Sequence, residues 1–400
     1  MPSEARYAAN IPKLYAIRLL FWMQFFAAVL VPFYTDWGGV TLADVFLINA
    51  WFFLCNFALE VPTGTVADFL GRRTSLLAGS VVGAFGVLFY AWRPSFALFL
   101  AAEAVMAVAY TLHSGADEAL AYDSLKADGR QAQAARVISR MESFKLGGII
   151  AATIVGGFIA AGFGLRAPMQ ATALPLTLAA LVALTLREPP GGNTLGPHRG
   201  YATLLRDGAR VFVSLPVVRR LAIEAAIVNA MAWGIIWLFQ PLLTRAGLPL
   251  SAFGIVHAAG CVAQIALLSS APALERLAGS RRRLIRLTTA GGGIAMLALA
   301  GPAWPPLVIA GIVGAMGLSL VRLPLLMAAV NHHVGSGERA TVLSFCGMTR
   351  QLAIVLVNPA IGALAGRSLP AALLVMGGAL LAAALLSRIT DAELEPPVPA

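Results

Sequence analysis

Charged residues are scarce in this sequence. Only 12% of its 400 residues are Asp, Glu, Lys or Arg, whereas 59% are hydrophobic. About a quarter of the residues in a typical soluble domain are charged, so this composition excludes a soluble globular fold. A helix that crosses a bilayer needs about 20 mostly apolar residues. The chain offers about twelve such segments, and we therefore expect an all-α polytopic membrane protein.

Cysteine is nearly absent as well. Cys55, Cys261 and Cys346 each lie inside an apolar segment, where a cysteine usually behaves as a small buried hydrophobe. They form neither a disulfide framework nor a metal-ligand spacing. The sequence also lacks a nucleophile elbow, a phosphate-binding loop and a metalloprotease motif. Nothing in it points to an enzyme, a bound metal or another cofactor.

The formal net charge of +10 does not indicate a nucleic-acid partner. The arginines stand in short connections between apolar segments, without the basic module and interleaved aromatics that bind nucleic acid. Such positive connections are typical of the cytoplasmic side of a membrane. The first apolar segment has no small-residue cleavage site after a short apolar core, so we expect it to remain as an anchor.

The apolar segments divide the chain into halves. We expect helices over 14–34, 42–69, 74–92, 95–123, 138–163, 168–187, 218–246, 251–275, 284–301, 305–332, 338–366 and 369–388. The only long connection follows the sixth helix, and alternating apolar and basic residues over 201–215 fit a short amphipathic helix on the membrane surface. We expect an N-terminal six-helix bundle over 1–190, a cytoplasmic central loop over 191–217 and a C-terminal six-helix bundle over 218–400.

Arginine and lysine set the expected orientation. If the N-terminus is inside, the connections on that side carry clusters such as Arg72 with Arg73 and the run from Arg281 to Arg283. The opposite connections carry arginine only singly, at Arg93, Arg166, Arg245 and Arg367. Both termini are therefore expected in the cytoplasm, and we expect a bacterial inner membrane protein.

The stretch from Glu60 to Arg73 ends one apolar segment and begins the next almost at once. On helical spacing Gly64, Asp68 and Gly71 lie at i, i+4 and i+7, so two residues without bulky side chains share a face with one carboxylate. That face suits close contact with another helix. The second half repeats the turn loosely over Leu274 to Arg283. Internal duplication of spans is typical of secondary transporters.

These features resemble the major facilitator superfamily (MFS), whose signature between the second and third helices reads G-x-x-x-D-[RK]-x-G-[RK]-[RK]. The matching residues are Gly64, Asp68, Gly71, Arg72 and Arg73, while Phe69 replaces a basic residue. The chain is similar to a subgroup that has E-x-P-T-G before the aspartate, here starting at Glu60. The same subgroup has S-G-x-x-E-A-L-x-Y-D-S-L at the end of the fourth helix, here Ser114 to Leu125. The resemblance implies twelve transmembrane helices in two pseudo-symmetric six-helix bundles.

The chain also departs from many exporters of this superfamily. They carry an arginine in the fourth helix, where this sequence has Glu103, and a G-P-x-x-G-G pattern in the fifth. Here the fifth helix has the glycines, such as Gly147 and Gly148, without the proline.

The resemblance further implies a cytoplasmic gate. In the family, the aspartate of the turn lies near a helix of the other half, and the arginines pair with an acid on the fourth helix. Carried over, Asp68 and Arg72 act with Asp123 to keep the cytoplasmic side closed in the outward-facing state. The expected gate comprises Gly64, Asp68, Gly71, Arg72, Arg73 and Asp123. The alternative is a tight turn with ordinary cytoplasmic arginines.

Ionisable residues inside a span are expensive and usually functional or paired. In the family the first, fourth, seventh and tenth helices line the cavity. The expected proton or substrate pathway comprises Arg18, Glu60, Glu103, Glu224, Asn229, Trp233, Arg322 and Arg350. Glu103 either carries a coupling proton or is permanently satisfied. Arg18 and Glu224 are shallow enough to snorkel, whereas the deeper Arg350 needs a partner or an anionic ligand.

Two local pairs have simpler interpretations. Glu142 and Lys145 are three residues apart and are expected to pair within one helix. His113 and Asp117 are four apart, and we expect them to bond one another.

From these features we expect a secondary active transporter that works by alternating access and exports a small organic molecule or drug in exchange for protons. Its partners would be that substrate and the lipid bilayer, with no nucleic acid and no cofactor, and it would act as a monomer. Two alternatives stay open: an importer or facilitator of a small metabolite on the same fold, and a transport-inactive membrane receptor or scaffold.

Overall fold

The computed structural model describes residues 7–190, 209–210, 212–335 and 339–395. The side chains of residue 61, of 65–68 and of 339–341 are outside this description. In these ranges all regular structure is helical and no strand occurs. Much of the expected central loop, including most of the expected amphipathic helix over 201–215, lies outside the described residues.

The chain forms two compact units. Unit 1 comprises residues 1–40, 54–198 and 250–258, and unit 2 comprises 41–53, 199–249 and 259–400. The units follow the order of the two halves along the chain, but the beginning of the second span belongs to unit 2 and the beginning of the eighth to unit 1.

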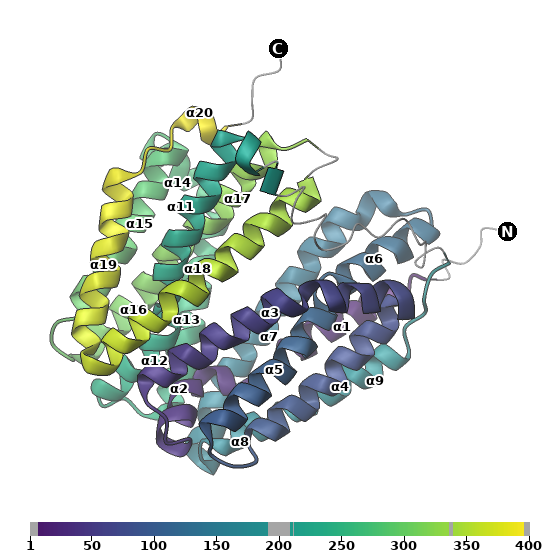
Figure 1. Ribbon diagram of the computed structural model, residues 1–400, viewed down its shortest axis with the longest axis horizontal. Coiled ribbons are helices and arrows are strands. Elements are labelled where there is room, and N and C mark those ends of the chain that lie inside the picture. The colour runs from purple at the N-terminus through teal and green to yellow at the C-terminus, as the bar shows by residue number, and fades with distance from the viewer. Residues whose placement is uncertain (1–6, 191–208, 211, 336–338, 396–400) are drawn as a thin grey trace. The chain divides into compact units, whose positions relative to one another are not determined.

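Unit 1 contains the first six helical spans. They are α1 (Asn10–Phe21) with η1 (Phe25–Ala28), α2 (Leu30–Pro32) and η2 (Phe33–Trp37), the later part of α3 (Leu42–Leu70), α4 (Arg72–Tyr90), α5 (Phe96–His113) with α6 (Ala116–Ala127), η3 (Gln131–Gln133) with α7 (Ala134–Phe163), and α8 (Arg166–Ala171) with α9 (Ala173–Leu184). Figure 1 shows α4 running beside α5 and α9, the two helices with which it makes its most extensive contacts.

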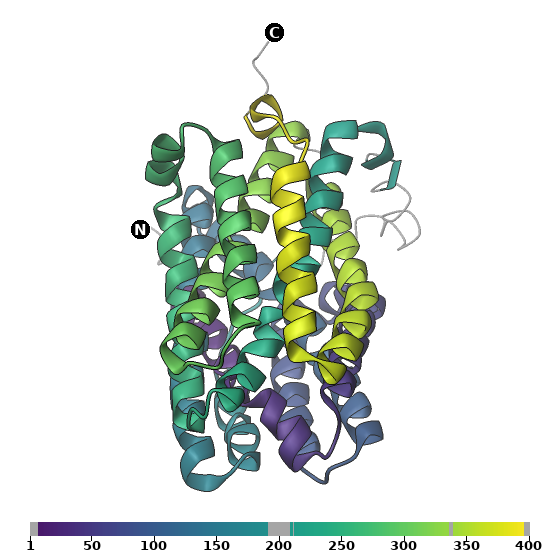
Figure 2. The same ribbon diagram turned by 90° about the vertical axis from the view of Figure 1, so that its left-hand side faces the viewer.

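Unit 2 contains the remaining spans. They are α11 (Pro216–Trp233) with α12 (Ile235–Arg245), the later part of α13 (Leu250–Ser269) with α14 (Ala271–Ala278), α15 (Arg281–Leu299), α16 (Pro305–Ser319) with α17 (Arg322–His333), α18 (Arg339–Arg367), α19 (Leu369–Leu386) and the short α20 (Asp391–Leu394). Figure 2 shows the yellow helix α19 next to the yellow-green α18, and α19 also packs against α15.

The helices correspond to the twelve expected spans. Within the described ranges, ten are long and apolar enough to cross a membrane, and the pair from Asn10 to Ala28 and from Leu30 to Trp37, bent by 63°, makes an eleventh. The ninth expected span is α15, whose first six residues include four arginines. The expected fold class, an all-helical polytopic membrane protein, is confirmed.

Glycine and a distant carboxylate shape the turn between α3 and α4. Gly71 has φ +91°, a conformation that residues with a side chain rarely adopt. The carboxylate of Glu188, which follows the sixth span, accepts the backbone N–H groups of Arg72 and Arg73, both at 2.9 Å. These N–H groups have no partner inside the helix, and the helix dipole favours a negative charge there. Glu188 therefore ties the start of the third span to the end of the sixth.

Unit 2 repeats this arrangement with other residues. The Asp391 carboxylate, which follows the twelfth span, accepts the backbone N–H of Arg282 near the start of α15 at 3.0 Å. Glu393 pairs with Arg220 of α11 at 2.7 Å, and its backbone carbonyl lies 2.8 Å from His333 Nε2 of α17. Leu394 is fully buried in the core of unit 2. The segment around α20 thus joins the ends of three spans.

Candidate functional site

The fourth span is interrupted at the residues of the Ser114 to Leu125 motif. Helix α5 ends at His113 and α6 begins at Ala116, because Gly115 adopts φ +72°. The Ser114 hydroxyl donates to Glu60 Oε1 on α3 at 3.0 Å. The interruption places Asp117 in the first turn of α6, where the helix dipole stabilises a carboxylate.

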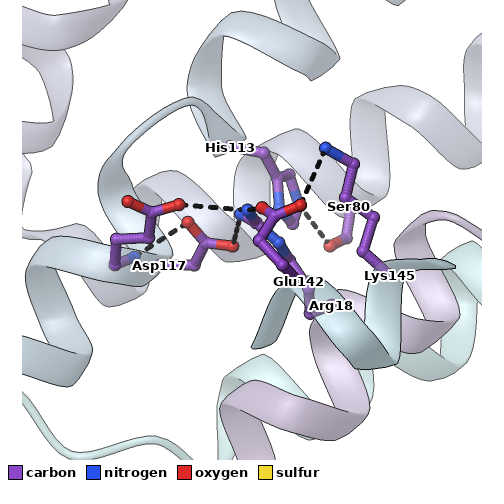
Figure 3. A network of polar contacts seen from close by, with 7 residues as sticks. Arg18, Ser80, His113, Asp117, Glu142 and Lys145 are labelled. Atoms are coloured by element: carbon purple, nitrogen blue, oxygen red, sulfur yellow. Dashed lines mark hydrogen bonds and ion pairs between the residues drawn. The ribbon is translucent and has the colours of Figure 1, made fainter. Parts of the chain in front are cut away.

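Arg18 of α1 is the centre of an ion-pair network. It pairs with Asp117 and with Glu118 of α6, the latter at 3.0 Å, and with Glu142 of α7. Glu142 also pairs with Lys145, at 3.3 Å, as the three-residue spacing predicted. Figure 3 shows Arg18 and Lys145 both directed at Glu142. We call these five residues the Arg18 network.

The Arg18 network has unequal numbers of the two charges. It contains three carboxylates and two cations, so one negative charge is in excess when all groups are ionised. The Asp117 side chain is only 2% exposed and that of Arg18 12%, whereas Glu118 is 41% exposed. The network is therefore buried at its centre and accessible at one edge, a geometry that lets a proton or a cation reach it.

Aromatic residues adjoin the network. The Phe21 ring stacks on His113 with centroids 3.7 Å apart, and Lys145 Nζ lies 4.5 Å from the centroid of Trp22. Tyr110 meets Trp22 edge to face. The expectation that His113 bonds Asp117 is wrong, because the interruption at Gly115 breaks the helical spacing between them.

His113 bonds another helix instead. Its Nε2 lies 3.0 Å from Ser80 Oγ of α4. Gly79 allows this approach, since a Cβ there would lie 2.6 Å from His113 Cδ2.

The residues of the expected gate are partly brought together. Arg72 forms an ion pair with Asp123 of α6, and its guanidinium also donates to the Ala119 carbonyl at 2.9 Å. Arg73 donates to the Leu184 carbonyl at 2.7 Å. Gly64 is exposed on α3, and the side chain of Asp68 is outside the described part of the structure. The turn is thus joined to the fourth and sixth spans.

Glu103 lies apart from the Arg18 network. It is 8% exposed and accepts a hydrogen bond from the Tyr34 hydroxyl at 2.9 Å. The hydroxyls of Tyr34 and Tyr90 are 3.1 Å apart. Glu103 precedes Asp117 by 14 residues, about 21 Å along a helix. It is hydrogen-bonded by tyrosine, and no cation pairs with it in the described ranges.

Unit 2 contains the corresponding ion pair with the signs reversed. Arg322, the first residue of α17 after an interruption in the tenth span, pairs with Glu224 of the seventh span and donates to Thr289 Oγ1 at 3.3 Å. In unit 1 the first span provides the cation and the fourth the carboxylate. Neither Arg18 nor Glu224 is simply snorkelling, since both are paired with a buried side chain.

The other expected pathway residues of unit 2 are not joined to this pair. Asn229 is 8% exposed on α11. Trp233 packs edge to face on Phe53, and its buried indole N–H has no hydrogen-bond partner among the residues that the structure describes. Arg350 of α18 is half-buried, and the described part of the chain gives it no hydrogen bond or ion pair.

Sequence reasoning missed several contacts. It did not place Asp117, Glu118 and Glu142 around Arg18, because the acids lie on the fourth and fifth spans and Arg18 on the first. Only their charge inside apolar segments marks these residues. It also missed Glu188, whose only signal is an acid directly after a span.

Comparison with known proteins decides the family. A family model described as the Major Facilitator Superfamily matches residues 15–357. The chain belongs to this superfamily. MFS proteins are multi-pass membrane transporters that generally need no cofactor, in agreement with the expectations from the sequence.

Solved transporters share the fold. The nucleoside transporter NupG is 14% identical, with a TM-score of 0.78 over 95% of this chain and 98% of its own. A D-xylose–proton symporter is 12% identical, with a TM-score of 0.76 over 97% and 99%. A bacterial homologue of the human lysosomal transporter Spinster is 18% identical, with a TM-score of 0.71 over 98% and 97%. At such identities the likeness shows the fold alone. No curated protein matches the chain.

Proposed function

We propose that this MFS protein is a secondary active transporter that moves a small organic molecule in exchange for protons, and that the Arg18 network carries the proton. The observation that supports this role is the excess of one carboxylate over the cations in the network. A transport site near interrupted helices is typical of secondary transporters. Here Arg18 binds carboxylates that directly follow the interruption in the fourth span.

Protonation would change the contacts of the network. A proton on one carboxylate removes the excess charge and weakens one bond to Arg18, which holds α1 to α6 and α7. A hydrogen bond to a charged group contributes about 1.5–3 kcal/mol. Since about 1.4 kcal/mol changes an equilibrium tenfold, loss of one such bond is enough to shift the balance between two conformations.

The remaining parts of the proposal concern direction and gating. We propose alternating access with export, both termini in the cytoplasm of a bacterium, and the Arg72–Asp123 pair as part of the cytoplasmic gate. The gate contacts within unit 1 support the last point. If Arg72 holds one state closed, its contacts there must be absent in the other state.

Gradient-driven transport in liposomes tests the proposal. A substrate is first found as a compound to which cells that lack the protein become more sensitive. The purified protein is then reconstituted, and transport of that compound is measured with a pH gradient, with a sodium gradient and with neither. We expect accumulation only with the pH gradient, with substrate moving opposite to the protons.

A matched pair of variants links the result to the network. Glu118→Gln removes the excess charge at an exposed position and should uncouple transport from the pH gradient. Asp36→Asn makes the same chemical change outside the network, where Asp36 contacts Thr35, and should behave as wild type. Movement of substrate with the protons would show an importer. A response to sodium alone, or no transport in any condition, would contradict the proposal.

A further inference from the structure

Arg350 differs from Arg322, which also lies well inside a span of unit 2. Arg322 is 2% exposed and bonded to Glu224 and Thr289. Arg350 is half-buried, and among the described residues it has no hydrogen bond or ion pair. Its guanidinium nitrogens are not among the fully buried polar atoms that lack a partner, so they retain accessible surface.

An arginine without an ion-pair partner is energetically unfavourable at the position of Arg350. It lies 11 residues after the start of α18 at Arg339, which corresponds to about 16 Å along the helix. A cation at such depth in a membrane span normally has a partner or faces an aqueous cavity. The distance from this depth to the end of the span is too long for one arginine side chain to reach water by snorkelling.

None of the described acids of unit 2 pairs with Arg350. Asp44 bonds Thr41, Glu224 pairs with Arg322, Glu275 with Arg281 and Glu393 with Arg220, Asp391 accepts the N–H of Arg282, and Glu395 lies exposed after α20. Among the described residues that lie well inside the spans of this unit, Arg322 and Arg350 are positive and Glu224 is negative. The interior of these spans therefore has one positive charge in excess, and Arg350 is the group that carries it.

We propose that Arg350 binds the anionic group of the transported molecule, which makes the substrate class a small organic anion such as a carboxylate or a phosphate ester. A guanidinium offers two parallel donors to such a group. The guanidinium retains accessible surface at which such a group can contact it. This inference rests on the proposed transport function, of which it names the substrate class.

Binding in detergent tests the inference without any gradient. The purified wild-type protein is heated in the presence of benzoate or of inorganic phosphate, with chloride at the same ionic strength as the reference. A ligand at concentration c that binds only the folded state raises the free energy of unfolding by RT ln(1 + c/Kd), and the melting temperature rises with it. We expect at least one of the two anions to stabilise wild type above the chloride reference.

Three variants test whether the stabilisation by the anion depends on Arg350. Arg350→Gln should weaken binding of the stabilising anion about tenfold or more, as expected for loss of a charge-assisted bidentate contact. Arg350→Lys keeps the charge and should bind with intermediate affinity, which a merely structural role of the arginine would not produce. Arg367→Gln changes an exposed arginine at the far end of the same helix and should bind as wild type.

Other outcomes would overturn the inference. These are equal stabilisation of wild type and Arg350→Gln, no stabilisation by either anion, or stabilisation by phosphatidylglycerol micelles alone, which would make Arg350 a lipid contact. Failure of proton coupling would leave anion binding in detergent unchanged, so the two proposals fail separately. Uptake driven by a pH gradient in Arg350→Gln at the wild-type affinity would likewise remove Arg350 from the substrate site.

Discussion

Replacing Asp117 by asparagine should destabilise the protein more than replacing Glu118 by glutamine. Both substitutions remove one negative charge from the same partner, Arg18. The carboxylates differ in burial, because the Asp117 side chain is 2% exposed and that of Glu118 is 41% exposed. The comparison therefore isolates the effect of burial on an ion pair inside one network.

The magnitude follows from this difference. Removing one partner of a buried ion pair costs about 3–5 kcal/mol when nothing replaces it. Arg18 keeps Glu118 and Glu142, and asparagine retains an acceptor oxygen, so we expect about 2 kcal/mol for Asp117→Asn, within the range for bonds to charged groups. An exposed pair contributes about 0.2–1 kcal/mol, and we expect about 0.5 kcal/mol for Glu118→Gln.

The assay is reversible unfolding in mixed micelles. Dodecyl sulfate is titrated into the purified protein, and loss of helix is followed by circular dichroism. The expected difference of about 1.5 kcal/mol is slightly more than tenfold in the unfolding equilibrium constant. Equal destabilisation by the two variants, or a larger effect of Glu118→Gln, would refute the reasoning that burial at the centre of the network strengthens the Arg18–Asp117 pair.

Further predictions concern the helix starts that distant carboxylates cap. Glu188→Gln and Asp391→Asn should each cost about 1 kcal/mol in the same unfolding assay, since a capping group contributes about 0.5–2 kcal/mol, whereas the exposed Glu395→Gln should cost nothing measurable. Gly71→Ala should cost at least about 1 kcal/mol, because φ +91° strains a residue with a side chain. The control Gly147→Ala, where a new Cβ meets nothing within 4 Å in α7, should be neutral or stabilising. Equal effects at the two glycines, or at the capping and exposed acids, would contradict these assignments.

The turn between the second and third spans was predictable because its determinants are local. Gly71 and the adjacent arginines stand together in the sequence, and the structure has the helix boundary at this glycine. The number and order of the spans were predictable for a similar reason, since length and apolarity alone define a span.

The partners of Arg18 were not predictable from the pattern. Asp117 and Glu142 are 99 and 124 residues away. In a helix of a soluble protein, the contrast between a polar and an apolar face shows which side is buried. Lipid is as apolar as a protein core, so a span is apolar on all sides and its sequence does not show which face points inward. The interruption at Gly115, on which the position of Asp117 depends, is marked by a single glycine.

The capping carboxylates were missed for another reason. Glu188 and Asp391 follow the sixth and twelfth spans and look like ordinary charges at a membrane surface. Their role appears only when the third and ninth spans are placed beside them. The two caps correspond between the halves, although the repeat was visible only in the arginine-rich turns.

The number of protons moved per substrate molecule tests the central claim most directly. A pH-sensitive dye inside liposomes reports proton flux while uptake of labelled substrate is counted, for wild type and for Glu118→Gln. The account predicts coupled proton flux in wild type and substrate movement without proton flux in the variant, because its network is already neutral. An unchanged proton-to-substrate ratio in Glu118→Gln would contradict the claim that the excess carboxylate of the Arg18 network carries the proton.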